Sequence, residues 1–560
     1  MVRYLAMSSD SNTNRKLIAG RSIRWDAERA SRAYAAGLWV SETLADSLRT
    51  AVRETPNRVL LVDGDSRIDC RALYAKALEL AHAMLARAPS GSVVSFMLPN
   101  WHEAAAIYLG ATLAGMVVNP ILPSLRDREL LFILQDVRSR LIFIPATLRQ
   151  QDHAAMLSRV VAQLDSPPEV VVVRGPPGPH TPYETLIQHE KSVVAQTAAS
   201  PDPDDLPSPD PDAVRMILYT SGTTGRAKGV MHTHNSIHAL LCQIREHWLV
   251  GRGDKFLVPS PIAHIGGSIY AFEAPLLLGT TAVLMDRWNA DDAVKLMEAE
   301  GCTHMAGATP FLEQLLAAAR RTGTRLPTLK LFVCGGASVP PSLIRDAATF
   351  FERAVVTRVY GSTEVPVTTV GATRTGDGRH GAETDGRPGL AEIKLIDHNG
   401  APAGEGEICA RGPQMLVGYL HPEDETPAFD AEGYFKTGDL ARWVDDAYIV
   451  VTGRAKDIII RNGENISPKE VEDLLVGHPG IAEVSIVGIP DPRTGERACA
   501  VIVPKQAPGP DVASLRSFLD SLGVATFKVP EAVVIWDALP KNDAGKVLKH
   551  QIRAALAPKS

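Results

Sequence analysis

The sequence has few cysteines, no excess of positive charge and no apolar run long enough to cross a bilayer. None of the six cysteines forms a CxxC pair, which excludes zinc-ribbon sites and a disulfide framework and fits reduced thiols. The apolar stretch at residues 104–118 is too short for a transmembrane helix and contains two glycines. The first residues lack the apolar core of a signal peptide. We therefore expect a cytoplasmic protein with no transmembrane segment.

The charge balance narrows the range of partners. The chain carries 58 Lys and Arg against 64 Asp and Glu, a net charge of −6, which argues against a surface built to bind nucleic acid. Its 45% hydrophobic and 22% charged residues are typical of a globular protein with a sizeable core. We expect small-molecule partners and no nucleic acid. The sequence leaves the oligomeric state open, a homodimer included.

Hydrophobic patterns divide the 560 residues into several parts. Between about residues 43 and 145, apolar helical stretches alternate with short β-rich runs, which predicts parallel strands with crossover helices. The Pro- and Asp-rich residues 201–212 predict an exposed connector. Alternation resumes after the connector and gives way to β character up to about residue 451. The residues from 457 onward have a small α+β pattern of their own.

The most informative segment is rich in Gly and Thr and follows the apolar run RMILYT. Its glycines let the backbone turn sharply, and its hydroxyls and one lysine suit phosphate oxygens, which predicts a polyphosphate-binding loop that runs into a helix. The candidate ligands are Thr220, Ser221, Gly222, Thr223, Thr224, Gly225 and Lys228. A Walker A loop is excluded, because Ala227 and Gly229 flank the lysine. A plain polar surface loop is the alternative, but such loops seldom stand between an apolar strand and a helix.

Three further clusters carry polar side chains. In YGSTE at 360–364, Glu364 suits a hard divalent cation and Tyr360 suits stacking on a base, although a solvated carboxylate explains the same letters equally well. FKTGD ends on Asp439, which is shaped for ribose hydroxyls, and Arg454 adds donors in the GRAKD segment that follows. PKNDAGK places Lys546 on a flexible turn near the C-terminus.

In this order and spacing, the loop, YGSTE, FKTGD, GRAKD and the terminal GK resemble the adenylate-forming superfamily of acyl-CoA synthetases, peptide-synthetase adenylation domains and firefly-type luciferases. The resemblance covers roughly residues 43–549. The segments 453–475 and 117–130 look most like the carboxylate–CoA ligase branch, including enzymes that act on cyclohexanecarboxylate.

The resemblance implies an α/β fold in two domains and a two-step reaction with ATP, Mg²⁺ and coenzyme A. The large domain (1–453) holds α/β layers plus a distorted β-barrel, and a hinge (454–457) leads to a small mobile α+β domain (458–560). In the implied reaction, a carboxylate attacks the α-phosphorus of ATP and forms an acyl adenylate and pyrophosphate. The thiol of coenzyme A then attacks the acyl carbon and expels AMP.

The same resemblance assigns the nucleotide contacts. The loop residues and Lys228 hold the β- and γ-phosphates, and Thr363 contacts the α-phosphate. The residues at Mg²⁺ are Glu364 and Thr220. The residues that enclose adenine are Gly335, Gly336, Ala337, Tyr360 and Gly361. The residues at the ribose are Asp439 and Arg454.

Further roles concern catalysis and domain movement. The resemblance implies that Lys546 bridges the carboxylate and the α-phosphate, and that His264 lies near the acyl carboxylate. Lys456 takes the hinge position, and Gly463 suits the close passage of the pantetheine chain. Asn542 stands where the family frequently has threonine, with no consequence that can be read from the sequence.

Other functions stay open beside the acid–CoA ligase. The chain could load its adenylate onto the phosphopantetheine of a carrier protein. It could also be a catalytically silent nucleotide-binding regulator. The joint retention of five candidate ligands argues against such a loss of activity: Lys228, Glu364, Asp439, Arg454 and Lys546. A luciferase-type oxygenase is disfavoured, because Ile460 stands where that group carries a lysine.

The acid itself is described only by class. The expected pocket walls, at residues 237–242, 264–269, 305–311 and 333–336, are apolar with small residues interspersed. Such a lining accepts an apolar acid, whether medium-chain, alicyclic or aromatic. It separates neighbouring substrates by only about 1–3 kcal/mol per methylene.

Overall fold

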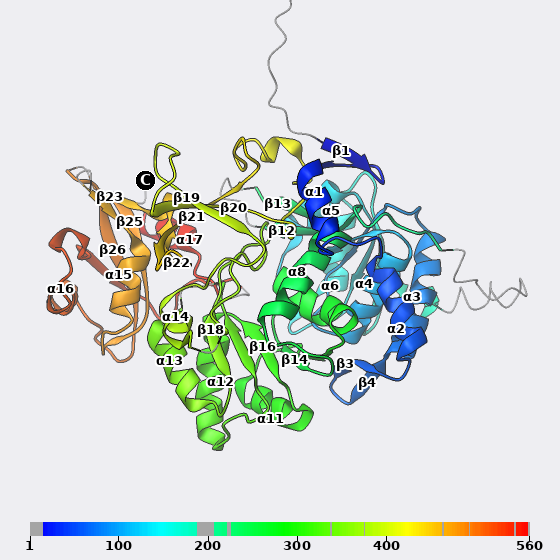
Figure 1. Ribbon diagram of the computed structural model, residues 1–560, viewed down its shortest axis with the longest axis horizontal. Coiled ribbons are helices and arrows are strands. Elements are labelled where there is room, and N and C mark those ends of the chain that lie inside the picture. The colour runs from blue at the N-terminus through cyan, green and yellow to red at the C-terminus, as the bar shows by residue number, and fades with distance from the viewer. Residues whose placement is uncertain are drawn as a thin grey trace, which may run out of the picture.

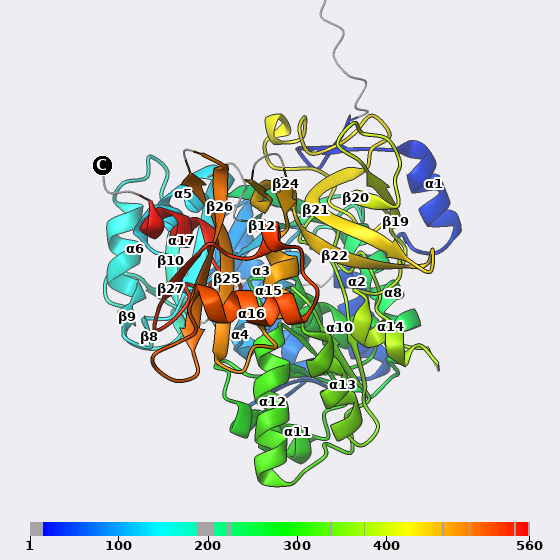
Figure 2. The ribbon, with the colours of Figure 1, turned by 90° about the vertical axis from the view of Figure 1, so that its left-hand side faces the viewer.

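The computed structural model describes residues 15–187, 206–220, 226–336, 339–374, 376–461, 464–491, 493–542 and 545–557. Residues 221–225, Ala337 and Gly463, which the sequence places in the site, lie outside this part of the chain. In Figure 1 the C-terminal part, orange to red, lies beside the large α/β part, and in Figure 2, turned by 90°, it lies in front of it. The small α+β unit expected from the sequence is therefore present.

One seven-stranded sheet has the order β11-β10-β7-β5-β6-β12-β13. Neighbouring strands in this sheet are parallel, except that β12 and β13 are antiparallel. This confirms the expected parallel arrangement. Its strands are β5 (Val93–Phe96), β6 (Val117–Pro120), β7 (Ser139–Ile144), β10 (Glu169–Val172), β11 (Thr181–Pro182), β12 (Val214–Thr220) and β13 (Lys228–Thr233).

A second seven-stranded sheet has the order β18-β17-β16-β14-β15-β3-β4, with only β3 and β4 antiparallel. Its strands are β3 (Val59–Asp63), β4 (Ser66–Asp69), β14 (Lys255–Val258), β15 (Thr281–Leu284), β16 (His304–Gly307), β17 (Leu331–Cys334) and β18 (Val355–Arg358). The carboxyl ends of its parallel strands meet along one edge, so residues that follow β14, β16, β17 and β18 are brought together there.

Helices connect and cover the two sheets. They are α1 (Ala27–Ala35), α2 (Leu44–Glu54), α3 (Cys70–Leu85), α4 (His102–Leu113), α5 (Asp127–Val137), α6 (His153–Val161), α8 (His234–His247), α11 (Ala290–Glu300), α12 (Thr309–Thr322), α13 (Pro341–Phe350) and α14 (Gly378–Glu383). Short hairpins are formed by β1 (Arg15–Ile18) with β2 (Arg21–Arg24), and by β8 (Thr147–Leu148) with β9 (Gln151–Asp152).

Helix α4 lies in the main core, which also includes residues of α2, α3, α8 and both large sheets. Its sequence is apolar on every side, and all of its residues from Ala104 to Leu113 are buried, as expected for a helix enclosed by other layers. Gly110 lets it approach α3 closely, because a Cβ there would lie 2.8 Å from Leu80 Cβ and 3.0 Å from the Ala77 carbonyl oxygen.

The β-rich part of the large domain is a four-stranded antiparallel sheet. Its strands, in order, are β19 (Glu392–Ile396), β20 (Glu405–Arg411), β21 (Phe435–Val444) and β22 (Tyr448–Arg454). Over the described residues β19 and β22 remain edge strands, so the sheet is open where the sequence suggested a distorted barrel.

The C-terminal unit has a five-stranded sheet and its own apolar core. The strands are β23 (Ile459–Arg461), β24 (Glu464–Ile466), β25 (Ile481–Asp491), β26 (Gly495–Pro504) and β27 (Ala532–Ile535). The helices are α15 (Pro468–Leu475), α16 (Val512–Ser521) and α17 (Lys549–Leu556). The short helix η4 (Ala455–Asp457) connects this unit to β22.

Two local expectations are corrected. The sequence predicts a helix directly after the phosphate loop, but β13 comes first and pairs with β12 before α8 begins. The sequence also predicts an exposed connector, and Ser208 and Asp210 are exposed, but its end at Asp212 is buried. The Asp212 carboxylate accepts hydrogen bonds from Tyr34 Oη at 2.9 Å and Asn235 Nδ2 at 2.8 Å, partners far away in the sequence.

Within the described part of the chain, no helix combines the length and apolar character needed to cross a bilayer.

We expect Gly110→Ala to destabilise the protein by about 1–3 kcal/mol, because the added Cβ overpacks the contact between α3 and α4. The midpoint of urea or thermal unfolding measures this loss. The matched control is Gly378→Ala, since Gly378 is also helical but a Cβ there would have no other atom within 4 Å. Equal midpoints for the two variants would contradict the close packing of α4.

Candidate active site

Glycines line the carboxyl edge of the second sheet. Gly335 follows β17 and donates its backbone N–H to the Gly307 carbonyl oxygen at 3.1 Å. A Cβ on Gly335 would lie 2.7 Å from the Val359 carbonyl oxygen, and a Cβ on Gly361 would lie 2.7 Å from Val367 N. Only glycine fits at these two positions. The adjacent turns therefore approach closely and present backbone beside Tyr360.

Tyr360 is fixed by a carboxylate from the four-stranded sheet. Its hydroxyl donates to Asp439 Oδ2 at 2.7 Å, and Arg454 Nε lies 2.7 Å from Asp439 Oδ1. Asp439 and Arg454 face each other on β21 and β22. Burial and the neighbouring Asp439 charge raise the pKa of the Tyr360 hydroxyl, so it remains a hydrogen-bond donor at neutral pH. The two expected ribose ligands and the expected adenine neighbour thus form one cluster.

Lys546 from the small domain belongs to the same cluster. Burial and the positive charge of Arg454 lower the pKa of Lys546 to about 8, and the Asp439 charge opposes this shift. A Cβ on the preceding Gly545 would lie 3.3 Å from Pro310 Cγ at the start of α12. The C-terminal turn therefore touches the large domain.

Asn542 gives this turn an internal contact that the sequence did not suggest. Its Oδ1 accepts a hydrogen bond from the backbone N–H of Lys546 at 2.8 Å. Short side chains with a carbonyl group commonly close turns in this way. The asparagine therefore helps to hold the backbone that carries the lysine.

Glu364 and Lys228 meet at another side chain, Tyr419. The Tyr419 hydroxyl donates to Glu364 Oε1 at 3.1 Å, and Lys228 Nζ lies 5.1 Å from the centre of the same ring. Lys228 Nζ is also 3.7 Å from Asp424 Oδ1. Thr220 is the register partner of Lys228 across β12 and β13. The two ends of the phosphate loop and the candidate metal ligand are therefore neighbours.

The backbone of the YGSTE segment is anchored by a buried histidine. His232 Nε2 donates to the Thr363 carbonyl oxygen at 2.8 Å. Burial lowers the pKa of His232 to about 4, so the imidazole is neutral at neutral pH and carries its proton on Nε2. Leu416 N donates to the Glu364 carbonyl oxygen at 2.7 Å. These bonds hold Thr363 and Glu364 from two sides.

Fewer contacts define the positions of the remaining expected site residues. Lys456 lies in η4, and burial together with the Arg454 charge lowers its pKa, which puts it beside the Asp439 cluster. His264 caps the start of α9 (Ile265–Ser268). It follows β14, which pairs with β16 in the second sheet. His264 therefore lies at the same carboxyl edge of this sheet as Gly335 and Tyr360. Gly336 has a left-handed backbone, with φ +81°.

The motifs alone did not reveal Tyr419 and Asp424. Both lie in the segment between β20 and β21, and Asp424 belongs to an acidic run at residues 423–425 that reads as an ordinary solvated surface turn. Their contacts join residues that are far apart in the sequence. No local pattern indicates them.

Two family models and several curated relatives match most of the chain. A family model described as AMP-binding enzyme matches residues 48–420, and one described as AMP-binding enzyme C-terminal domain matches residues 470–546. A medium-chain fatty-acid–CoA ligase of Escherichia coli K12 is 34% identical over 546 residues, covering 95% of this chain and 94% of the relative. A sulfoacetate–CoA ligase of Cupriavidus necator is 31% identical, covering 91% and 97%.

Among solved structures, ATP-bound MatB from Rhodopseudomonas palustris superimposes with a TM-score of 0.79 at 25% identity, covering 91% of this chain and 98% of that one. Its likeness extends over the large and small domains together. The family model alone spans more than half of the chain. The chain therefore belongs to the AMP-binding enzyme family.

Proposed function

We propose that the chain is an ATP-dependent carboxylic acid–CoA ligase that acts on an apolar acid. The observation that supports this most is the convergence of four side chains from distant segments in one cluster, namely Tyr360, Asp439, Arg454 and Lys546. The CoA ligases among its relatives, and the share of each chain that they cover, support the same reaction class.

The first half-reaction brings two anions together, the carboxylate and the triphosphate. Positive charges that are already in position remove this repulsion without a protein nucleophile. We assign Lys228, with the loop 220–225, to the β- and γ-phosphates and Thr363 to the α-phosphate. Lys546 bridges the carboxylate and the α-phosphorus, where negative charge develops. Asp439 and Arg454 take the ribose, and Tyr360 with the Gly335 turn encloses adenine.

Glu364 and Thr220 are suited to hold Mg²⁺. Glu364 uses Oε1 for Tyr419, so Oε2 can face a cation, and the hydroxyl of Thr220 is a second hard oxygen of the kind that Mg²⁺ prefers. Both residues lie beside the Lys228 contact. When bound, Mg²⁺ would neutralise phosphate charge. The protein's part is to hold the Glu364 carboxylate through Tyr419 and the backbone bond from Leu416.

The second half-reaction requires Lys546 to leave, because its side chain stands where the thiol must approach. We propose that the small domain (458–560) turns about the hinge (454–457), with Lys456 as the pivot. The movement would bring the loop around Gly463 towards the acyl adenylate. His264 would remain beside the acyl carboxylate during both steps.

An apolar acid is favoured by the side chains near His264. Ile265, Ala306, Val359 and Val367 are only partly buried and pack against the main core, so they offer apolar surface near the carboxyl edge of the second sheet. The E. coli relative named for medium-chain fatty acids also favours an apolar chain. The six described cysteines are all unpaired, which supports a cytoplasmic location.

The function is tested by ATP–pyrophosphate exchange over octanoate, cyclohexanecarboxylate, benzoate, malonate and sulfoacetate. We expect the first three acids to support exchange and the two small dianions to fail, because an apolar lining does not compensate their second charge. Thioester formation is then measured with coenzyme A and with a phosphopantetheinylated carrier protein. The proposal would be contradicted if none of the acids supported exchange. It would also be contradicted if the acyl group were transferred to the carrier protein and not to coenzyme A.

We expect Lys546→Ala to lower the rate of adenylation by about 10²–10³-fold, because the charge at the reacting phosphorus is lost. Conversion of preformed acyl adenylate and coenzyme A to the thioester should stay near the wild-type rate. Lys541→Ala is the control, since Lys541 lies in the same turn and pairs with Glu483 at 2.6 Å. Equal loss in the two half-reactions would refute the separate role of Lys546.

The pKa of Lys546, about 8, predicts the pH dependence of adenylation. The lysine is charged below this pKa and neutral above it, so kcat/KM for adenylation should fall as pH rises through about 8. Lys546→Arg, which stays charged, should lose this alkaline limb even if its rate is lower. Thioester formation from preformed acyl adenylate should show no such limb. A flat adenylation profile up to pH 10 in the wild type would exclude the lysine as the titrating group.

A further inference from the structure

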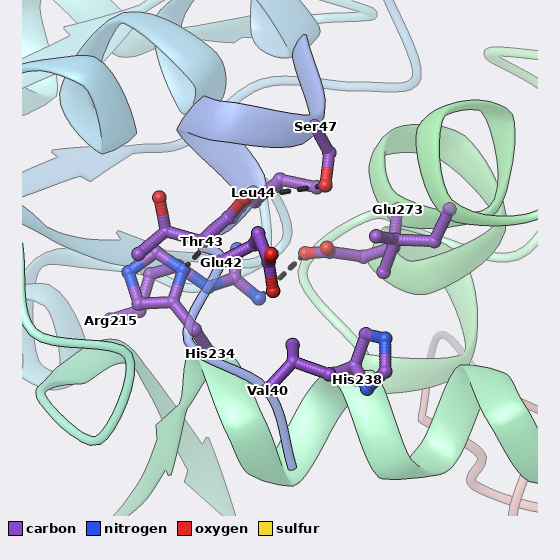
Figure 3. Close-up of a pocket in the computed structure, with 10 residues that line it drawn as sticks. Val40, Glu42, Thr43, Leu44, Ser47, Arg215, His234, His238 and Glu273 are labelled. Carbon is purple, nitrogen blue, oxygen red and sulfur yellow. Dashed lines mark hydrogen bonds and ion pairs between the residues drawn. The ribbon is translucent and has the colours of Figure 1, made fainter. Parts of the chain in front are cut away.

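A buried ion pair lies away from the nucleotide cluster and takes no part in the reaction described above. Arg215 Nη2 lies 2.7 Å from Glu273 Oε1, and both side chains are 1% exposed. Arg215 Nη1 donates to the Tyr108 hydroxyl at 2.6 Å, and this hydroxyl donates to Glu273 Oε1. Figure 3 shows Arg215 and Glu273 reaching towards each other from opposite sides of a small cavity. The pair joins β12, α4 and a helical segment.

Arg215 reaches this position from a β-bulge. Val214 pairs with Thr233 and Met216 with His232, so the register between β12 and β13 shifts across Arg215. Bulges re-aim a side chain and increase the local twist of a strand. From Arg215, β12 runs on to Thr220, over about 17 Å for five residues of extended chain. The strand therefore connects the ion pair directly to the phosphate loop.

Glu273 ends a π-helical turn. The helical segment comprises α9, η2 (Ile269–Glu273) and α10 (Ala274–Leu277), and Ala274 N donates to the Ile269 carbonyl oxygen five residues back. Pro275 explains the widening, because its ring would clash with the carbonyl four residues earlier in a regular α-helix. His264 stands at the start of this segment, about 13 Å from Glu273 at helical rise.

Stability alone does not account for the pair. Replacing a buried ion pair by apolar side chains of similar size is often neutral or stabilising, because two charges must be desolvated to form it. Arg215 Nε, which has no hydrogen-bond partner among the described residues, adds to this cost. An ion pair does supply direction, since it holds only when its atoms face each other at short range.

We propose that Arg215 and Glu273 form a positioning pair that sets the angle between β12 and the helical segment from His264 to Leu277. The inference rests on the proposed function. A tilt of about 5° at the pair would move His264 by about 1 Å relative to the phosphate loop, given the lever of about 13 Å. Displacements of this size can cost about 100-fold in rate when two reactants must be held in line.

The cavity beside the pair makes a direct test feasible. It has a volume of about 110 Å³, and its lining includes Glu42, His234 and His238. His234 Nδ1 accepts from Leu44 N at 3.3 Å, and burial together with the Arg215 charge lowers its pKa well below the usual range. His234 is therefore neutral and does not compete with Arg215 for Glu273. The free volume leaves room for a longer side chain at position 273.

The principal variant is Arg215→Met with Glu273→Leu, an apolar pair of similar size. We expect an apparent Tm close to the wild type, a fall of about 10–100-fold in kcat for ATP–pyrophosphate exchange and little change in KM for ATP. The polarity-reversed variant, Arg215→Glu with Glu273→Arg, should recover part of the lost rate. The control is Arg345→Met with Glu383→Leu, an exposed pair at 3.7 Å, which should leave kcat unchanged.

A measurement that does not depend on catalysis tests the positioning role separately from the proposed function. Hydrogen exchange of peptides covering 264–277 should be faster in the apolar variant than in the wild type and the control. If the wild type shows no acid-dependent exchange of pyrophosphate, the proposed function fails, while hydrogen exchange still tests the pair.

Wild-type kcat and unchanged hydrogen exchange in the folded apolar variant would overturn the positioning role. If that variant does not fold, Tyr108→Phe tests the positioning role instead. It removes two hydrogen bonds between Tyr108 and the ion pair and keeps the aromatic ring. A several-fold loss of kcat at wild-type Tm supports the role, and full activity overturns it.

Discussion

The carboxylate of Asp439 is the interaction on which the proposed site depends. It is 8% exposed, and it accepts from Tyr360 and Arg454 at 2.7 Å each. The positive charges of Arg454, Lys456 and Lys546 gather around it, and Asp439 offsets part of their repulsion. Without this anion the cations would be held together only by their backbones. The site therefore carries concentrated positive charge before an anionic substrate arrives, which is the preorganisation that electrostatic catalysis requires.

The contacts between the small and the large domain bear on the domain movement proposed above. Among the described residues, the small domain's contacts with the large domain include the Gly545 turn at Pro310 and the approach of Lys546 to Asp439. The Ser467 hydroxyl also donates to the Thr452 carbonyl oxygen at 2.5 Å. These contacts are local, whereas the small domain encloses a continuous apolar core of its own. Interfaces of this kind permit relative movement, which the proposed turn of the small domain about the hinge requires.

Local patterns predicted a large part of this structure. The alternation of apolar helical stretches with β-rich runs, which builds the parallel parts of the two large sheets, is a pattern within a few residues. The glycines beside Tyr360 were expected only from the family resemblance. The Tyr419, Asp424 and Arg215 contacts could not be predicted, because each joins segments far apart in the chain. The burial of Asp212 was missed for the same reason. A Pro- and Asp-rich run predicts irregular backbone, but only the positions of Tyr34 and Asn235 determine that one of its carboxylates is enclosed.

Buried charge serves two different purposes in this fold. Around Asp439 the charges face the place where an anion is expected, and their excess is positive. At Arg215 and Glu273 the charges balance each other and face no substrate. Apolar contacts have no preferred direction, whereas the hydrogen bonds of the Arg215 pair require donors and acceptors aligned at short distance. A balanced pair placed where β12 meets the π-helical turn therefore constrains orientation, and β12 and the helical segment carry that constraint to Thr220 and His264.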